Sequence, residues 1–221
     1  MINRSIAIDG PAGSGKSIMA KLLSEKKGYV YLDTGAMYRT VALKAIRCGI
    51  STLDGKKLGD LIKNIDLKLV IEHNTQHMFL DGECVDTLIR TNEVSKGASD
   101  VSKFPPVRLF LVEMQRDIAK KYDVVMEGRD IGTYVLPQAD FKFFLTATNE
   151  IRAERRYKQM IEAGKNTTYE EILADIIYRD KQDSGRDFAP LKKADDAILI
   201  DTTNKNIDEV FNTLLGCING R

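Results

Sequence analysis

The chain has 221 residues, and its 33 lysine and arginine residues nearly balance 32 aspartate and glutamate residues, which gives a net charge of +1. This balance excludes a surface field that would attract nucleic acid or a membrane, so any anion site must come from locally placed arginines. The length allows one substantial hydrophobic core with a small insert, which predicts a single domain over residues 1–221.

Cysteine usage and hydropathy indicate the environment of the protein. The three cysteines, at positions 48, 84 and 217, form neither a metal-spaced pair nor a disulfide framework, as is typical of a reducing compartment. The sequence has no apolar run of membrane-spanning length, and a strand pattern begins at residue 5, so we expect no signal peptide. We therefore expect a cytoplasmic protein, with a monomer as the default because no heptad stretch occurs.

A glycine-rich segment follows the first predicted strand, Ser5–Asp9, and precedes a predicted helix over Lys16–Lys27. Residues 10–17 fit the phosphate-binding pattern G-x-x-x-x-G-K-S/T. Glycines let backbone N–H groups approach phosphates, and the helix N-terminus adds partial positive charge. Lys16 is expected to reach the β- and γ-phosphates, and the hydroxyl of Ser17 to face magnesium. The predicted ATP-binding residues are Gly10, Pro11, Ala12, Gly13, Ser14, Gly15, Lys16, Ser17 and Ile18.

Four more strand-like runs follow, with helical patterns between them. They cover residues 29–33, 123–126, 141–145 and 197–201. Short apolar strands that alternate with helices predict an α/β fold with a parallel sheet covered on both faces. Three of the five strands end near Asp9, Asp33 or Glu127, and ligands of such sheets bind beyond the carboxyl ends of the strands. The sequence therefore predicts that these polar motifs cluster at one site.

Residues of about 58–102 break the alternation and predict an inserted subdomain. Two strands, over 67–73 and 77–81, are expected around the turn at 74–76, with a third strand over 83–90. A helix is expected over 92–103, and another begins at Phe104-Pro105-Pro106. The insert either closes over a ligand or is a sheet extension without functional motion.

Two histidines, His73 and His77, have a spacing that would suit a metal on a helix. Their flanking pattern is that of strands, which puts them on two different strands. Because the sequence has no acidic or cysteine cluster to support them, we expect no metal at this pair.

Arginine placement is the second strong signal of the sequence. Arginines follow predicted strands and recur on predicted helices, several with acidic neighbours; these positions are Arg39, Arg129 with Asp130, Arg152, Arg155, Arg156, Arg179 with Asp183, and Arg186. Arginine binds phosphate through two parallel hydrogen bonds and keeps its charge at any working pH. Converging arginines would neutralise a donor and an acceptor that are both anionic, as phosphoryl transfer requires.

Two details of the arginine helices stay open at this point. Thr168 and Glu171 form a capping box, and if the helix continues far enough, Arg179, Asp183 and Arg186 share one face. The arginines between 152 and 156 have an alternative interpretation as a solvated helix face with salt bridges.

The sequence gives no sign of covalent catalysis, because neither of its two histidines has a recognisable nucleophile partner. A phosphate monoester has its second pKa near 6 and is largely ionised at neutral pH. It attacks without a strong general base, which favours a nucleotide or another phosphate as the acceptor over an alcohol.

Six segments, in this order, resemble the bacterial cytidylate kinase family over nearly the whole chain. They are residues 8–16 (IDGPAGSGK), 32–39 (LDTGAMYR), 89–94 (IRTNEV), 98–108 (with AS and FPPVR), 127–133 (EGRDIGT) and 179–191 (from RD to APL). The first segment is shared by many families, whereas DTGAMYR and GRDxGT are much more specific.

The resemblance implies transfer of the γ-phosphoryl group of ATP to CMP or dCMP with Mg²⁺. It implies a P-loop kinase fold with a five-stranded parallel sheet, an inserted subdomain over about 58–102 that binds the monophosphate, and a lid over about 151–167. It implies CMP-binding roles for Ser99, Arg108 and Asp130 at the base, for Tyr38, Arg179 and Asp183 at the sugar, and for Thr34, Arg39, Arg129 and Arg186 at the phosphate. The expected catalytic residues are Lys16, Arg39, Arg129, Arg155, Arg156 and Arg186.

One residue departs from the family pattern. Ile18 stands where the family usually has threonine, and isoleucine can pack beneath the loop but offers no hydroxyl to a phosphate oxygen. The second magnesium ligand stays open among Asp33, Glu127, Asp130, water and the nucleotide phosphates. Alternative functions are a P-loop kinase for UMP, shikimate or gluconate, and a nucleotide-dependent switch that binds a partner protein.

Overall fold

Five parallel strands form the central sheet, in the order β2-β6-β1-β7-β8. The computed structural model describes residues 3–220, so residues 1, 2 and 221 of the predicted 1–221 domain lie outside the described residues. The strands are β1 (Ser5–Asp9), β2 (Val30–Asp33), β6 (Val124–Gly128), β7 (Phe141–Thr146) and β8 (Ile198–Asp201). All five predicted strands are confirmed, with ends that differ by at most two residues.

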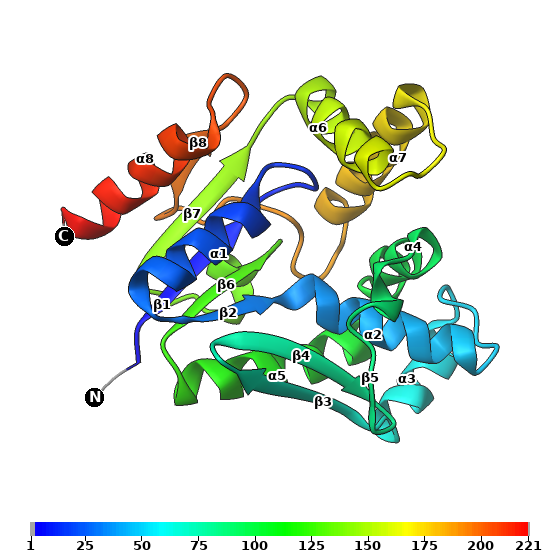
Figure 1. Cartoon of the computed structure of the whole chain (residues 1–221). Coiled ribbons are helices and arrows are strands. Elements are labelled where there is room, and N and C mark those ends of the chain that lie inside the picture. Colours follow the sequence, from blue (N-terminus) through cyan, green and yellow to red (C-terminus); the bar gives the residue numbers. More distant parts are fainter. Residues whose placement is uncertain (1–2, 221) are drawn as a thin grey trace.

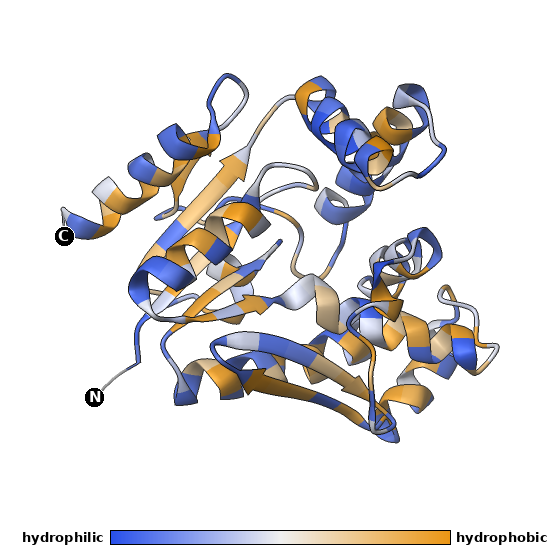
Figure 2. Cartoon of the chain, in the orientation of Figure 1, coloured by the Kyte–Doolittle hydropathy of each residue, from blue (hydrophilic) through white to orange (hydrophobic). Residues whose placement is uncertain are grey.

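Helices cover both faces of this sheet, as the continuous apolar runs predict (Figures 1 and 2). On one face, Ile6 and Ile8 of β1 pack in a cluster with α1 (Lys16–Lys27) and α8 (Ile207–Asn219). On the other face, Ala7 packs in a cluster with Val112 and with residues of a π-helical turn. The elements there are α5 (Pro105–Lys121) and η2 (Ile131–Val135).

The insert packs around a second hydrophobic cluster beside the sheet. The elements around this cluster are α2 (Thr34–Arg47), which precedes the insert, and then α3 (Gly55–Lys63), β3 (Leu67–Glu72), β4 (Thr75–Leu80), β5 (Glu83–Cys84), η1 (Leu88–Arg90) and α4 (Asn92–Val101). The strands β3, β4 and β5 form a separate antiparallel sheet. Figure 1 shows this sheet along the lower edge of the molecule, beside α2 and α5.

Two details of the insert correct the sequence interpretation. The hairpin turn lies at His73 and Asn74, which both have positive φ, rather than at 74–76. This is the backbone of a two-residue type I′ turn, whose twist matches that of the strands. The predicted third strand over 83–90 pairs only at Glu83 and Cys84, and η1 follows it.

The helices α6 (Asn149–Glu162) and α7 (Tyr169–Ser184) have a small hydrophobic cluster of their own. Figure 1 shows them as a pair at the upper right. The predicted capping box at the start of α7 is confirmed, because Thr168 and Glu171 each bond the backbone of the other. The helix ends before Arg186, however, so Arg186 does not lie on its face with Arg179 and Asp183.

The parallel register brings the acidic strand ends to one edge of the sheet. Asp9 of β1 lies opposite Gly128 of β6, and Asp33 of β2 lies opposite Glu127. The predicted clustering of the polar motifs is therefore confirmed. Within residues 3–220, none of the helices is both long and apolar enough to cross a membrane.

Candidate active site

A cleft of about 1280 Å³ runs between the P-loop (residues 10–17), α2 and α4 on one side and α6 and α7 on the other. It is lined by the ATP-binding residues predicted from 12 to 18 and by every predicted CMP-binding residue: Thr34, Tyr38, Arg39, Ser99, Arg108, Arg129, Asp130, Arg179, Asp183 and Arg186. Arg155 and Arg156 line it too. Gly10 and Pro11 do not line the cleft; they lie in the first part of the loop, directly after β1.

The P-loop backbone depends on its glycines, because Gly10, Gly13 and Gly15 all have positive φ. Gly10 has φ +147°, and a Cβ there would lie 2.0 Å from the carbonyl oxygen of Leu145. Gly15, at the N-cap of α1, has φ +92°. No side chain among the described residues caps this helix, so its first N–H groups face the cleft without a local acceptor. An anionic group is the natural partner for such a helix end.

Lys16 is buried beside this helix end, although it carries the positive charge that the motif needs. Its Nζ donates to the carbonyl oxygen of Pro11 at 2.6 Å. Burial, with the positive charge of Arg129 as the next cause, lowers the pKa of Lys16 to about 7. A phosphate bound in the cleft would reverse this effect, because an anion favours the charged form of lysine.

Ile18 does not pack beneath the loop. Its side chain lines the cleft and the residue is 40% exposed. Isoleucine therefore presents an apolar surface at the position where the resemblance implies a hydroxyl.

Glu127, at the end of β6, joins the P-loop to β2. Its carboxylate accepts hydrogen bonds from Ser17 Oγ at 2.8 Å and from the hydroxyl of Tyr31, while its carbonyl accepts from Thr34 Oγ1 at 2.7 Å. Burial and the nearby Asp33 raise the pKa of Glu127. A buried carboxylate next to the motif hydroxyl forms an oxygen donor set of the kind that Mg²⁺ binds.

The other two candidate magnesium carboxylates are occupied by arginines. Asp33 accepts from Arg39 at 2.6 Å and from Arg90 at 3.4 Å. Asp130 accepts from Arg108, one of the most deeply buried side chains of the structure. Of the three carboxylates, only that of Glu127 contacts Ser17.

The acceptor side of the cleft contains further arginine–carboxylate pairs. Arg129 Nε donates to Asp183 at 2.7 Å, and Arg186 Nε donates to the carbonyl oxygen of Asp183 at 3.2 Å. Burial opposes the ionisation of Asp183, but Arg129 and Arg186 outweigh it and hold the pKa of this carboxyl below its usual value. The pairs therefore keep both carboxylate and guanidinium charges in place at neutral pH.

Several polar atoms of these residues have no hydrogen-bond partner. Among the described residues, eight buried side-chain nitrogen and oxygen atoms have none, and five of them belong to the predicted CMP-binding set. These five are Arg39 Nε, Ser99 Oγ, Arg108 Nε, Arg179 Nε and an Arg186 terminal nitrogen. Buried polar groups are rarely left unpaired, so their concentration in one cleft indicates a polar, anionic ligand.

The three arginines of α6 separate into different roles. Arg152 is buried, and its guanidinium bonds Asp180 of α7 and, at 2.8 Å, the carbonyl oxygen of Ala12 in the P-loop. Arg152 therefore joins α6, α7 and the P-loop in this structure. Arg155 donates to the carbonyl oxygen of Thr202 at 2.6 Å and lines the cleft with Arg156.

Sequence reasoning missed the contacts of two side chains that support the site. Tyr31 was seen only as a strand residue, and its bond to Glu127 joins positions 96 residues apart. Asp9 accepts from the backbone N–H groups of Ile131 at 2.8 Å and Gly132 at 2.7 Å, which anchors the turn after Asp130 to the strand before the P-loop. Burial raises the pKa of Asp9 to about 6. An acidic residue at the end of a buried strand was the available signal.

Residues 6–220 match the family described as Cytidylate kinase. The chain belongs to the cytidylate kinase family. A cytidylate kinase from Clostridioides difficile (strain 630) is 48% identical over 99% of this chain and 100% of that protein. Another from Bacillus subtilis (strain 168) is 45% identical over 97% of this chain and 96% of that protein.

A solved structure shares the fold of this cytidylate kinase family member. A gluconokinase from Sinorhizobium meliloti 1021 superposes with a TM-score of 0.51 and 13% identity, over 97% of this chain and 91% of that chain. At that identity the likeness concerns the fold alone, and it agrees with the predicted P-loop kinase architecture.

Proposed function

We propose that this chain transfers the γ-phosphoryl group of ATP to CMP or dCMP, giving ADP and CDP or dCDP in pyrimidine nucleotide metabolism. The observation that carries the proposal is the set of five unpaired polar atoms in a cleft that the P-loop also lines. Membership of the cytidylate kinase family supports cytidine nucleotides as the class of acceptor.

The donor side acts by positioning and charge. The N–H groups at the start of α1 and the ammonium of Lys16 bind the phosphates of ATP, as the open helix end and the motif favour. Ser17 and Glu127 would hold a magnesium ion, which would neutralise charge on the β- and γ-phosphates. Arg155 and Arg156 approach the transferring group from α6.

The acceptor side holds CMP by its phosphate, sugar and base. Arg39, Arg129 and Arg186 bind the phosphate, which supplies its own nucleophilic oxygen near neutral pH. Tyr38, Arg179 and Asp183 hold the sugar. Ser99, Arg108 and Asp130 read the base, because a carboxylate accepts from the amino group of cytosine and an arginine donates to its ring acceptors.

We also propose roles for the two smaller parts of the chain. Residues of about 58–102 form the acceptor-binding subdomain, and residues of about 151–167 form the lid. In support, η1 and α4 bring Arg90 and Ser99 to the cleft, and α6 and α7 have a small core of their own. Lid closure excludes water, which would otherwise accept the phosphoryl group. The chain acts as a cytoplasmic monomer, in line with its free cysteines.

An acceptor screen tests the proposed function. ADP formation from ATP and Mg²⁺ is followed in a coupled assay with CMP, dCMP, UMP, AMP and shikimate in parallel. Rapid turnover with CMP and dCMP and slow turnover with the others is expected. Preference for another acceptor would retain a P-loop kinase but reject the cytosine pocket. Slow hydrolysis that no acceptor stimulates would favour a nucleotide-dependent switch.

The assignment of Glu127 makes a separate prediction about magnesium. Glu127→Gln is expected to raise the Mg²⁺ concentration needed for half-maximal activity at least about tenfold, because an amide offers the cation no charge. Since burial raises the pKa of Glu127, a neutral side chain there is compatible with the fold. Tyr31→Phe, which removes only the bond to the carboxylate, serves as the control and should change the requirement less. An unchanged magnesium requirement in Glu127→Gln would contradict the assignment.

A further inference from the structure

A second group of metal-ligand side chains lies on the insert, away from the cleft. His77 of β4, Cys84 of β5 and Asp86 just beyond β5 have ligand atoms that all lie within 4.8 Å of one another. We propose that these three residues bind a zinc-class divalent cation, at a site separate from the magnesium of the phosphoryl-transfer reaction.

The backbone holds these side chains in place. Cys84 pairs with Phe79, two residues from His77, so the side chains of His77 and Cys84 share one face of the sheet. Asp86 Oδ1 accepts from the N–H of Met78 at 2.8 Å, which turns Oδ2 toward His77 Nδ1, also at 2.8 Å. A cation about 2.0 Å from both atoms needs a separation of about 3.3 Å, a small widening of this contact.

The donor set selects the class of cation. Imidazole, thiolate and carboxylate together are typical zinc ligands, whereas magnesium prefers oxygen alone. The negative charges of the thiolate and the carboxylate would balance a divalent cation. Cys84 is exposed, which leaves the remaining coordination position to solvent. His77 and Asp86 also line a cleft of about 480 Å³ that gives the cation a path of entry.

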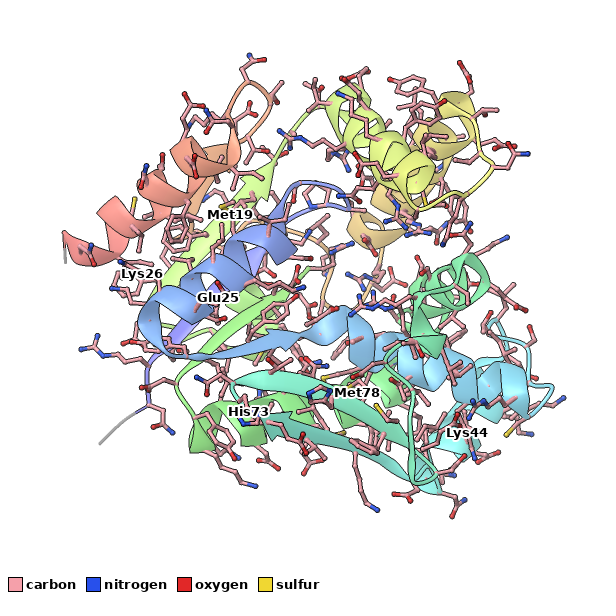
Figure 3. All side chains as sticks on the ribbon, viewed as in Figure 1. Met19, Glu25, Lys26, Lys44, His73 and Met78 are labelled. Carbon is pink, nitrogen blue, oxygen red and sulfur yellow. The ribbon has the colours of Figure 1, made fainter. Side chains whose placement is uncertain are left out.

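Folding explains why the sequence interpretation expected no metal here. That interpretation considered His77 and His73 together as possible ligands. His73 lies in the hairpin turn, however, as Figure 3 shows, where Met78 marks the strand β4. The turn at Asp81 and Gly82 returns the chain beside β4 and brings Cys84 and Asp86 to His77. Strand pairing therefore forms the supporting cluster, whose members are not adjacent to His73 and His77 in the sequence.

A bound cation would strengthen a weak part of the insert. The strand β5 has only two residues, and the cation would join it to β4 by side chains as well as by the backbone. Next to His77, Gln76 bonds the backbone N–H and carbonyl of Asp33, at 2.8 and 3.2 Å. The cation site thus lies on the strand that attaches the insert to the end of β2.

Metal titration of the full chain tests the proposal with matched controls. Binding of Zn²⁺ is measured by equilibrium dialysis in excess Mg²⁺, and Co²⁺ is added separately to detect thiolate-to-cobalt absorption. The chain has only two histidines and three cysteines. The ligand variants are His77→Gln, Cys84→Ser and Asp86→Asn, and the controls are His73→Gln and Cys48→Ser.

One equivalent of Zn²⁺ is expected to bind the wild-type chain and both controls, with each ligand variant weakened at least about tenfold. The absorption band of Co²⁺ bound to a thiolate should be lost in Cys84→Ser and retained in Cys48→Ser. Zn²⁺ should also raise the melting temperature of the wild type but not of Cys84→Ser, whose exposed position keeps the fold intact. Less than one equivalent bound, or equal binding by ligand and control variants, would overturn the proposal.

Discussion

Replacing Lys16 by alanine is expected to lower turnover with ATP and CMP at least about a hundredfold, the scale of losing one major charge contact in the transition state. Lys16 is the cation that the motif aims at the transferring phosphoryl group, and its Nζ is held at 2.6 Å from the carbonyl oxygen of Pro11. The measurement is kcat in the coupled assay at saturating substrates. Near-normal turnover of Lys16→Ala would contradict the assignment of Lys16 to the ATP-binding site.

A neighbouring lysine supplies the matched control. Lys21 is exposed on the same helix and lines the other cleft, so Lys21→Ala should leave turnover close to that of the wild type. If both variants lost activity alike, the loss would reflect the helix α1 rather than the phosphate contact.

The lowered pKa of Lys16 adds a stability readout that does not depend on activity. Its pKa is about 7 in the folded chain against an ordinary 10.5, so the unfolded chain binds more protons between these values. Burying the charged form of Lys16 lowers the free energy of unfolding, and this destabilisation is complete below about pH 7. It is lost as pH rises from about 7 to 10.5, so the free energy of unfolding increases over that range. Lys16→Ala removes this contribution, and its stability should rise less over that window. If the free energy of unfolding changed equally with pH in the wild type and in Lys16→Ala, the conclusion that burial lowers the pKa of Lys16 would be contradicted.

The central sheet was predictable because its signals are local. Each strand is a short, mostly apolar run. In β1 the side chains of Ile6 and Ile8 are buried on one face of the sheet and that of Ala7 on the other, so the whole run is apolar, as in a strand buried on both faces. The acidic strand ends then converge because parallel strands end at the same edge. The antiparallel insert was harder, since the pairing of β5 stops after Cys84 where the segment leading to η1 leaves the sheet.

The candidate site was predictable in its residues but not in their contacts. Motifs name Ser17 and Arg108, yet the partners that position them, Glu127 and Asp130, lie 110 and 22 residues away. Arg152 shows the converse: it lies on the same helix as the cleft residue Arg156, but Asp180 and the P-loop carbonyl of Ala12 already bind its guanidinium. Only the folded chain distinguishes a guanidinium that is already satisfied from one that is free to bind phosphate.

Asp130→Ala is expected to lower the ratio of CMP to UMP efficiency, measured as kcat/KM, by about 10- to 100-fold, equivalent to about 1–3 kcal/mol of base discrimination. Cytosine offers an amino group to the carboxylate, whereas uracil presents a carbonyl oxygen that the carboxylate repels. The KM for ATP should change little, because Asp130 lies on the acceptor side with Arg108. An unchanged ratio would refute the role of Asp130 in reading the base.

The same substitution leaves a charge without its partner. Arg108 is 1% exposed, and removing the carboxylate from a buried pair costs about 3–5 kcal/mol, so Asp130→Ala should also melt at lower temperature. Asp130→Asn separates the two effects, because its amide fills the same space and can donate to the uracil carbonyl. It should shift preference toward UMP beyond the alanine variant while losing less stability. If the ratio followed melting temperature across both variants, Asp130 would support the pocket rather than read the base.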